Sequence, residues 1–321
     1  MILLNILVAA HHDQVQFKNI INQDSQFQND NIFYDDEQTL DQTTLANIDI
    51  LLGNNQELLS KILNLPQARL TWIQLLSTGI DYLPLKQIQQ HHILLTTLKG
   101  LHAEPIAESV IGMILSHYRA LNFASRQHNW QKLTADLQML SNKQVVIFGT
   151  GHIGSRCAQL LQAFHAHTIG VNHNGHPASN FEKTVATKKL NSAIFQADII
   201  INTMPLTPDT KKFFNAAFFN QLKNQPLFIS IGRGLSTNTN DLITALRQQQ
   251  ISSAALDVTD PEPLPSDNPL WQMENVLITP HIAGDFQEYP QQAIQFFQKN
   301  LQQFRQNHTV NINLVDWNKG Y

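Results

Sequence analysis

Cysteine is nearly absent from the chain: its 321 residues include one, Cys157, so no disulfide can form within a single copy. That residue falls in a predicted helix, where we expect a small core side chain rather than a nucleophile. Charge is also scarce, at 14% of residues with a net charge of −4 and no basic cluster, which argues against a nucleic-acid or anionic-membrane partner. No apolar run reaches the roughly 18 residues of a membrane-spanning helix, and residues 1–10 lack the positive charge that begins a signal peptide. We therefore expect a cytoplasmic protein.

What the chain does have is a regular alternation of short apolar runs with helical patterns. Its length suits two domains, and a 42% share of hydrophobic residues can bury a substantial core. Alternating strands and helices predict parallel sheets covered by helices, so we expect an α/β protein with two doubly wound parallel-sheet domains. The predicted strands are Ile2–Val8, Ile48–Leu52, Trp72–Leu76 and Ile93–Thr96 in the first part, then Val145–Phe148, Thr168–Asn172, Asp198–Thr203, Leu227–Ile231, Ser252–Val258 and Val276–Thr279.

A glycine-rich turn follows the first strand of the second part. The sequence Gly149-Thr150-Gly151-His152-Ile153-Gly154 fits Gly-x-Gly-x-x-Gly. In that motif the first glycine allows a tight turn, the second lets a pyrophosphate approach the backbone, and the third lets helix pack on strand. An ordinary strand-to-helix turn is the competing interpretation, but strand, turn and helix come in the required order. The motif therefore favours a Rossmann dinucleotide-binding domain, which we place at residues 99–286, after a first domain at residues 1–98.

The residues after the second strand of this domain bear on cofactor choice. An Asp or Glu about 20 residues past the glycines would bind the ribose 2′-hydroxyl of NAD. Asn172 and His173 stand there instead, with no carboxylate. Neutral Asn172 would not repel the 2′-phosphate of NADP, and His173 could donate a hydrogen bond to it, although His173 could equally be an exposed loop histidine. The sequence favours NADP(H) and does not exclude NAD(H).

Three stretches place a chemically useful side chain directly after a predicted strand. They carry Arg233 between two glycines, Glu262 in a proline-rich loop, and His281 after Pro280. Reduction of a 2-oxo acid needs such a set: Arg binds the carboxylate, and a protonated His donates to the carbonyl oxygen as hydride arrives. A neighbouring Glu orients the ring and favours its charged form. Taken alone, Arg233 could cap a helix, Glu262 could be a solvated loop charge, and His281 could be a structural histidine. Together with the glycine motif, they favour an active site.

Two further stretches leave alternatives open. The loop Ser77-Thr78-Gly79-Ile80-Asp81 presents backbone N–H groups that could bind a small carboxylate, or it is an ordinary capped glycine turn. Residues 104–122 predict one long helix with a broad apolar face. We expect that face to be buried between domains or subunits, and a core helix of one domain is the alternative.

Nearly the whole chain resembles the D-isomer-specific 2-hydroxyacid dehydrogenase family. The matching segments are residues 77–81, 149–154, Met204 to Thr210, 232–234, Asp257 to Pro263, and Pro269 to Gly284. The resemblance implies an NAD(P)-dependent oxidoreductase with Arg233, Glu262 and His281 as the catalytic set, His281 being the acid–base. It also implies a flavodoxin-like substrate domain to which residues 287–321 return.

The resemblance assigns further residues to ligands. It implies that the backbone N–H groups of Thr78 and Gly79 help Arg233 to hold the substrate carboxylate, and that Asp257 lies near the nicotinamide carboxamide. The other residues implied around the nucleotide are Met204, Pro205, Thr210, Ile231 and Gly284. Family members are usually homodimers built around the helix that corresponds here to residues 104–122. We predict no metal site.

Some residues of the chain depart from the family pattern, and these departures bear on which substrate the protein accepts. Thr97 replaces a frequent Asn, residues 285–289 are atypical, and Pro280 stands where formate-oxidising relatives have Gln. We predict a reductase of small 2-oxo acids to D-2-hydroxy acids. The alternatives are a nucleotide-sensing, corepressor-like binding protein on the same fold and a phosphoglycerate dehydrogenase. Against the latter, we see no concentrated basic pocket in the first domain and expect no regulatory domain after residue 321.

Overall fold

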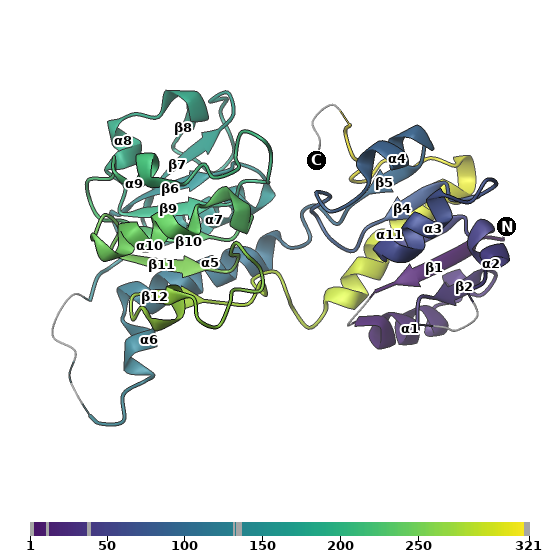
Figure 1. Ribbon diagram of the computed structural model, residues 1–321, viewed down its shortest axis with the longest axis horizontal. Coiled ribbons are helices and arrows are strands. Elements are labelled where there is room, and N and C mark those ends of the chain that lie inside the picture. The colour runs from purple at the N-terminus through teal and green to yellow at the C-terminus, as the bar shows by residue number, and fades with distance from the viewer. Residues whose placement is uncertain (1–2, 11–12, 37–39, 131, 133–136, 318–321) are drawn as a thin grey trace. The chain divides into compact units, whose positions relative to one another are not determined.

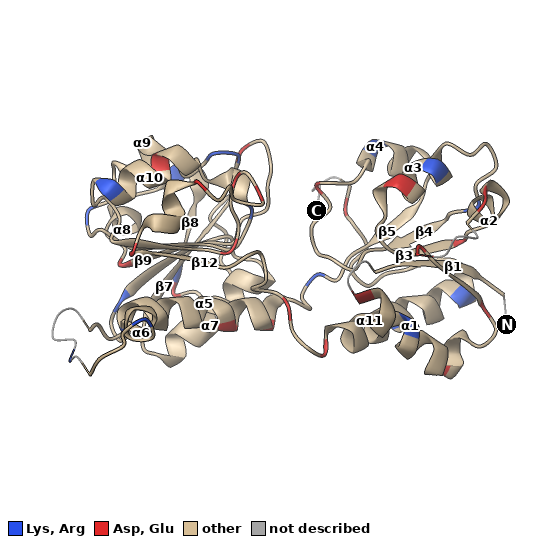
Figure 2. Ribbon diagram, turned by 60° about the horizontal axis from the view of Figure 1, so that its bottom comes forward, with Lys and Arg blue, Asp and Glu red and all other residues tan. Residues whose placement is uncertain are grey.

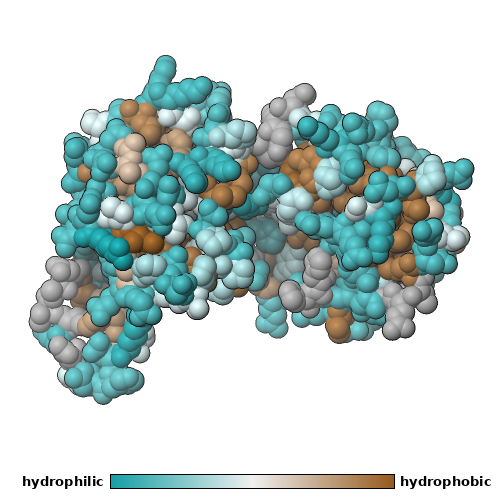
Figure 3. Space-filling view, viewed as in Figure 1, coloured by the Kyte–Doolittle hydropathy of each residue, from teal (hydrophilic) through white to brown (hydrophobic). Residues whose placement is uncertain are grey.

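The computed structural model describes residues 3–10, 13–36, 40–130, 132 and 137–317. The chain forms two compact units, each a parallel sheet with helices on both faces (Figure 1). Unit 1 comprises Met1–Leu101 and Phe286–Tyr321, and unit 2 comprises His102–Asp285. Polar side chains cover much of the face shown in Figure 3. No helix in the described ranges is long and apolar enough to cross a membrane.

Unit 1 has a five-stranded sheet in the order β2-β1-β3-β4-β5, with every neighbouring pair parallel. This is the flavodoxin-like order, so the predicted fold of the first domain is confirmed. The strands are β1 (Asn5–Ala9), β2 (Asn31–Tyr34), β3 (Ile50–Gly53), β4 (Trp72–Gln74) and β5 (Leu94–Thr96). The helices are α1 (Gln14–Gln23), α2 (Gln42–Ala46), α3 (Gln56–Leu63), α4 (Leu85–Gln90) and α11 (Tyr289–Asn307), with a 3₁₀ turn η2 (Ser25–Phe27).

The core of unit 1 follows from the alternation of side chains along buried strands. In β1, Ile6 and Val8 face one layer while Leu7 and Ala9 face the other. The first layer holds α1 and α11, and the second holds α3 and α4 (Figure 2). Trp72 from β4 packs against aromatic rings of α11, with centroids 5.1 Å from Phe297 and 5.2 Å from Phe304. The last long helix is therefore part of this unit's core.

Unit 2 has a seven-stranded parallel sheet in the order β12-β11-β10-β9-β6-β7-β8. The first six strands in chain order follow the Rossmann arrangement, which confirms the predicted α/β fold. The strands are β6 (Gln144–Phe148), β7 (His167–Asn172), β8 (Lys183–Ala186), β9 (Ile199–Asn202), β10 (Leu227–Ser230), β11 (Ser253–Leu256) and β12 (Val276–Ile278). The helices are α5 (Ala103–Tyr118), α6 (Leu121–Ala124), α7 (His152–Ala163), α8 (Ser192–Phe195), α9 (Ala216–Phe219) and α10 (Thr239–Arg247), with 3₁₀ turns η3 (Thr187–Lys189), η4 (Gly234–Ser236) and η5 (Pro269–Gln272).

The structure corrects the helix predicted over residues 104–122. Helix α5 ends at Tyr118, because Ala120 adopts a left-handed backbone with φ of 51°, and α6 begins separately at Leu121. The apolar face of α5, including Val110 and Ile114, is buried within unit 2 against the sheet and α7. The apolar face of α5 therefore belongs to the core of one domain, which was the alternative to burial between domains or subunits.

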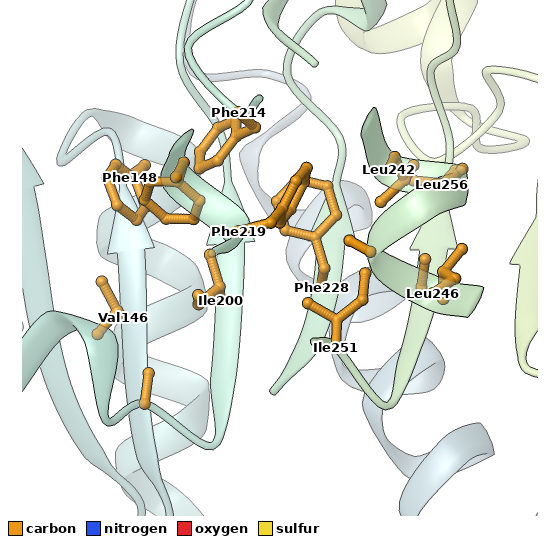
Figure 4. Close-up of a cluster of buried hydrophobic side chains, with 14 of the residues drawn as sticks. Val146, Phe148, Ile200, Phe214, Phe219, Phe228, Leu242, Leu246, Ile251 and Leu256 are labelled. Carbon is orange, nitrogen blue, oxygen red and sulfur yellow. The ribbon is translucent and has the colours of Figure 1, made fainter. Parts of the chain in front are cut away.

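The opposite face of the sheet is packed with phenylalanine (Figure 4). Phe148, Phe214 and Phe228 are fully buried, and their rings meet near edge-on, with centroids 5.0 Å apart for the first two and 5.1 Å for the last two. Such pairs add about 0.5–1.5 kcal/mol each to the burial of the rings. This cluster is the core between one face of the unit 2 sheet and the helices that cover it.

Candidate active site

The glycine-rich turn joins β6 to α7 at the carboxyl edge of the unit 2 sheet. Gly149 has a φ of 98°, a conformation that side chains disfavour, and a Cβ on Gly154 would lie 2.0 Å from the carbonyl oxygen of Gly149. A Cβ on Gly151 would meet nothing within 4 Å. Helix α7 begins directly after it with His152 and the half-buried Ile153, so free N–H groups and the positive dipole end lie beside this open space. These residues fit a dinucleotide pyrophosphate.

The other residues predicted around the nucleotide follow the neighbouring strands of the same sheet. Met204 comes after β9 and Ile231 after β10, and both are buried. The Thr210 hydroxyl donates to the Pro205 carbonyl oxygen at 2.7 Å, which closes the loop after β9. Thr210 therefore shapes this loop, whose backbone can line a nucleotide.

The side chain of Asn172, at the end of β7, is hydrogen-bonded within its own loop and to the glycine-rich turn. Its Nδ2 donates to Thr150 Oγ1 at 3.1 Å and to the His176 carbonyl oxygen at 2.9 Å, while Oδ1 accepts from Gly175 N at 2.6 Å. His173 is exposed directly after it. The side chain of Asn172 thus holds the turn in shape, and His173 is the residue presented to solvent.

His281 and Glu262 meet in the structure. His281 follows β12, Glu262 follows β11, and His281 Nδ1 lies 2.6 Å from Glu262 Oε1. The two side chains are 51% and 40% exposed, so a small molecule can reach them. Because the carboxylate engages Nδ1, the ring's Nε2 is the nitrogen left to exchange a proton with a substrate.

The buried carboxylate of Asp257 holds the loop that carries His281. Its Oδ1 accepts from Thr279 Oγ1 at 2.5 Å, from Ile282 N at 3.0 Å and from Ala283 N at 3.1 Å. The backbone N–H of His281 donates to the Asp257 carbonyl oxygen at 2.9 Å. The sequence indicated a nucleotide contact for Asp257 and did not indicate these bonds, since none of the partners is adjacent in the chain.

Helix α5 holds the same loop from the other side. Ser109 Oγ donates to the Ala283 carbonyl oxygen at 3.1 Å, and His102 Nδ1 lies 3.2 Å from the Gly284 carbonyl oxygen. Burial lowers the pKa of His102 below the ordinary histidine value, and the contact with Gly284 opposes that shift in part. The loop is therefore fixed by both β11 and α5.

Arg233 follows β10, between two glycines that allow close packing. A Cβ on Gly232 would lie 2.5 Å from the Met204 carbonyl oxygen, and one on Gly234 would lie 1.7 Å from the Thr259 carbonyl oxygen. Arg233 Nη1 donates to the Gly232 carbonyl oxygen at 2.9 Å. Strands β10, β11 and β12 are neighbours, so the loops of Arg233, Glu262 and His281 emerge side by side from one sheet edge.

In unit 1, the loop after β4 carries the predicted carboxylate-binding groups. Within the described part of the chain, the backbone N–H groups of Thr78 and Gly79 have no hydrogen-bond acceptor. The preceding Ser77 Oγ lies 2.7 Å from the hydroxyl oxygen of Tyr82, which secures the loop. Beside it lies a cavity of about 460 Å³, with Ser77 and Tyr82 in its wall. The loop can thus offer two N–H donors at the edge of a cavity.

Two wall residues of this cavity come from opposite ends of the chain. Asp13 stands at the start of α1, and Tyr289 comes from the start of α11. No local motif marks Asp13. Tyr289 lies in the atypical stretch 285–289, and only the fold brings α11 to this sheet. Among the residues described, no group of three or more His, Cys, Asp or Glu side chains is placed to hold a metal ion.

The chain is similar to known proteins over most of its length. Residues 111–283 match the family model described as D-isomer specific 2-hydroxyacid dehydrogenase, NAD binding domain. The chain is 33% identical to the human glyoxylate reductase/hydroxypyruvate reductase over 234 residues, which cover 70% of each protein.

Two solved structures cover nearly the whole chain. The D-isomer specific 2-hydroxyacid dehydrogenase family protein from Aeromonas salmonicida is 28% identical with a TM-score of 0.84, covering 98% of this chain and 99% of its own. The phosphoglycerate dehydrogenase from Lactobacillus plantarum is 37% identical with a TM-score of 0.56, covering 97% of this chain and 100% of its own.

Proposed function

Since the chain belongs to the D-isomer-specific 2-hydroxyacid dehydrogenase family and is an NAD(P)-dependent oxidoreductase, we propose that it reduces small 2-oxo acids to D-2-hydroxy acids. The observation that carries this proposal is the 2.6 Å contact between Glu262 and His281 at the carboxyl edge of the sheet that also carries the glycine turn. An acid–base pair and a nucleotide-binding turn on one sheet are what carbonyl reduction requires.

The chemistry of the proposed reaction divides among three side chains. The reduced nicotinamide, when bound, supplies the hydride that the carbonyl carbon accepts. His281 donates the proton from Nε2 to the carbonyl oxygen, so C=O becomes CH–OH, and Glu262 stabilises the charged ring through Nδ1. Arg233 binds the substrate carboxylate with its planar fork and stabilises the negative charge that develops on the carbonyl oxygen. We also assign carboxylate binding to the backbone N–H groups of Thr78 and Gly79.

We propose NADP(H) as the preferred cofactor. No carboxylate follows β7 to repel a 2′-phosphate, and His173 is exposed at that point. The Thr187 hydroxyl donates to the His173 carbonyl oxygen at 3.4 Å, which brings η3, with the exposed Lys188 and Lys189, next to this loop. Lys188 and Lys189 could pair with a 2′-phosphate bound beside His173. Met204, Ile231, Asp257 and Gly284 are proposed to line the rest of the nucleotide.

We further propose a cytoplasmic homodimer, with unit 1 as the substrate domain and unit 2 as the dinucleotide-binding domain. The resemblance puts the dimer interface along residues 104–122. Because α5 buries its apolar face within its own unit, we propose that exposed apolar residues of α6 and of residues 137–139 also contact the second copy. Leu121, Phe123, Leu137 and Met139 are all at least 44% exposed there. Light scattering of the purified protein at the mass of two chains supports the dimer, and a monomer that stays active contradicts it.

The test of the proposed function is the decay of nicotinamide absorbance with NADPH and NADH in parallel. The substrates are glyoxylate, hydroxypyruvate, pyruvate, 2-oxoisocaproate and phenylpyruvate. Turnover of any of them supports the reductase, and a higher kcat/KM with NADPH supports the cofactor assignment. Tight nucleotide binding without turnover of any substrate would instead indicate the nucleotide-sensing protein.

A further inference from the structure

The backbone of His281 is held in an uncommon conformation. Its φ is 56°, in the left-handed region that residues other than glycine rarely adopt. Such a residue keeps its conformation only where the surrounding structure fixes it. The His281 side chain is also 51% exposed, so packing around the ring does not fix the direction of Nε2. That direction therefore depends on the backbone of residues 281–284 and on the contact with Glu262.

Ala283, two residues later, is hydrogen-bonded at both its N–H and its carbonyl group. The N–H donates to the Asp257 carboxylate, at 3.1 Å from Oδ1 and 3.2 Å from Oδ2. The carbonyl oxygen accepts from Ser109 Oγ at 3.1 Å. Ala283 is 4% exposed, so water does not readily replace either partner. The backbone that follows His281 is thus held between the end of β11 and helix α5.

One face of α5 contacts this loop. His102, Ile106 and Ser109 have the spacing i, i+4, i+7, which places them on the same side of the helix. His102 Nδ1 lies 3.2 Å from the Gly284 carbonyl oxygen. A Cβ on Gly284 would lie 3.3 Å from His102 Nδ1 and 3.5 Å from Ile106 Cγ1, so loop and helix are in close contact. This face of α5 therefore holds two consecutive residues of the loop.

The hydroxyl group of Ser109 acts on the loop and not on its own helix. Serine is a weaker helix former than alanine, and its hydroxyl often bonds a carbonyl one turn earlier in the same helix. The Ser109 hydroxyl instead donates to a residue 174 positions further along the chain. A half-buried position that only had to pack would be filled equally well by alanine. What serine adds at this position is the bond to Ala283.

We propose that Ser109 is a positioning residue for the acid–base His281. Its bond to Ala283 keeps the left-handed backbone, and with it the ring, in the orientation needed for proton transfer from Nε2. The proposal rests on the proposed function, because His281 needs this orientation only if it transfers a proton. It gives α5 a part in catalysis in addition to its place in the core of unit 2.

The test measures kcat and KM of the full chain carrying Ser109→Ala, with the best 2-oxo acid of the panel above and the better of NADPH and NADH. An error of about 1 Å in the position of a reacting group can cost about 100-fold in rate. Because His102 still holds the next carbonyl group, we expect a smaller fall in kcat, about 3–10-fold, the scale of one hydrogen bond. KM and the Kd of the cofactor should change by less than about twofold, since neither ligand is bound by Ser109.

Two further variants of α5 serve as controls. Ser109→Thr keeps the hydroxyl group and should restore kcat to near the wild-type value. Ser116→Ala removes another half-buried serine two turns further along α5, which has no hydrogen bond to residues 281–284 in the described part of the chain. It should leave kcat unchanged. A fall in kcat as large as that of Ser109→Ala would overturn the proposal.

A double-mutant cycle separates positioning of His281 from a general loss of structure. In the His281→Ala background, Ser109→Ala should change the residual kcat by less than about twofold, because no proton donor is left to position. An effect on structure alone would lower kcat by the same factor in both backgrounds, and that result overturns the proposal.

The outcomes also separate this inference from the proposed function. A wild-type chain that turns over no 2-oxo acid contradicts both the reductase and the positioning role. Turnover by the wild type with an unchanged kcat in Ser109→Ala overturns the role of Ser109 alone. If Ser109→Ala does not fold, Ser109→Val and Ser109→Thr replace it, because these two side chains share a shape and differ in the hydroxyl group. Equal kcat of those two variants then overturns the proposal.

Discussion

The two units of this protein build the same kind of parallel sheet but present their functional groups in different ways. In unit 2, the loop of His281 is held by Asp257, directly after β11, by Ser109 of α5 and by His102 at the N-cap of that helix. In unit 1, the loop of Thr78 and Gly79 leaves its N–H groups without acceptors among the described residues, beside a cavity. Proton transfer needs atoms fixed to within fractions of an ångström, whereas a carboxylate can be bound by N–H donors that a loop leaves open.

This contrast predicts where substitutions act. Changes in the fixed loops of unit 2 should lower kcat for every substrate, because they disturb the acid–base pair itself. Changes in the cavity of unit 1 should alter kcat/KM by different amounts for different substrates, because the cavity adjoins the loop proposed to bind the substrate carboxylate. The predictions below test this division.

The largest effect is expected from His281→Ala. Loss of the acid–base group should lower kcat by about 10²–10⁴-fold for glyoxylate and for the larger 2-oxo acids alike, with NADPH affinity nearly unchanged. Steady-state kinetics and quenching of protein fluorescence by NADPH measure the two quantities. Glu262→Gln should give a smaller loss in the same direction, and a variant at position 281 that keeps full turnover would falsify the assignment.

The next effect concerns the stability of each core. Phe228→Ala removes a fully buried ring from unit 2 and should cost about 3–5 kcal/mol in the free energy of unfolding. Hydrogen exchange should then quicken in β9 and β10 and stay slow in β1 and β3. Phe297→Ala, in unit 1, is the matched variant and should give the reverse pattern. Equal acceleration throughout the chain would mean that the two units unfold together.

A smaller effect is expected from Asp257→Asn. Its carboxylate accepts bonds from Ile282 N and Ala283 N, and an amide that turns its NH₂ group toward them leaves buried donors without acceptors. The free energy of unfolding should fall by about 1–3 kcal/mol, and kcat should fall for all substrates while their relative order is kept. A changed order of kcat among the substrates would contradict the view that the fixed loops of unit 2 affect all substrates equally.

The smallest effect is the response to acid. Burial lowers the pKa of His102 and of His117, both in unit 2, below the ordinary value of 6.5. The neutral forms are favoured in the folded state, so the unfolded state binds more protons below that pH. The stabilisation is complete above pH 6.5 and is lost as the pH falls below it. Thermal unfolding at pH 7.5 and 5.5 should show the loss, and His117→Asn should reduce it.

Local sequence was enough for the fold class and the family. Buried parallel strands such as β6 and β10 are continuous apolar runs, which are visible in the sequence. The glycine motif predicts a strand–turn–helix geometry, because each of its three glycines occupies a position where a side chain would clash or block the ligand. The edge strands β2 and β8 were missed because each is paired on one side only and is partly exposed, so neither needs an apolar run. The roles of Arg233, Glu262 and His281 remain predictions that the assays above test.

The sequence by itself determined which side chains could do chemistry, because residue type and position after a strand are local properties. Only the tertiary structure decided what surrounds them. Asp257 reaches the His281 loop across neighbouring strands, and α11 brings Tyr289 to a cavity that residues near the start of the chain also line. Contacts between residues far apart in the chain depend on the packing of whole elements, which no short stretch of sequence encodes.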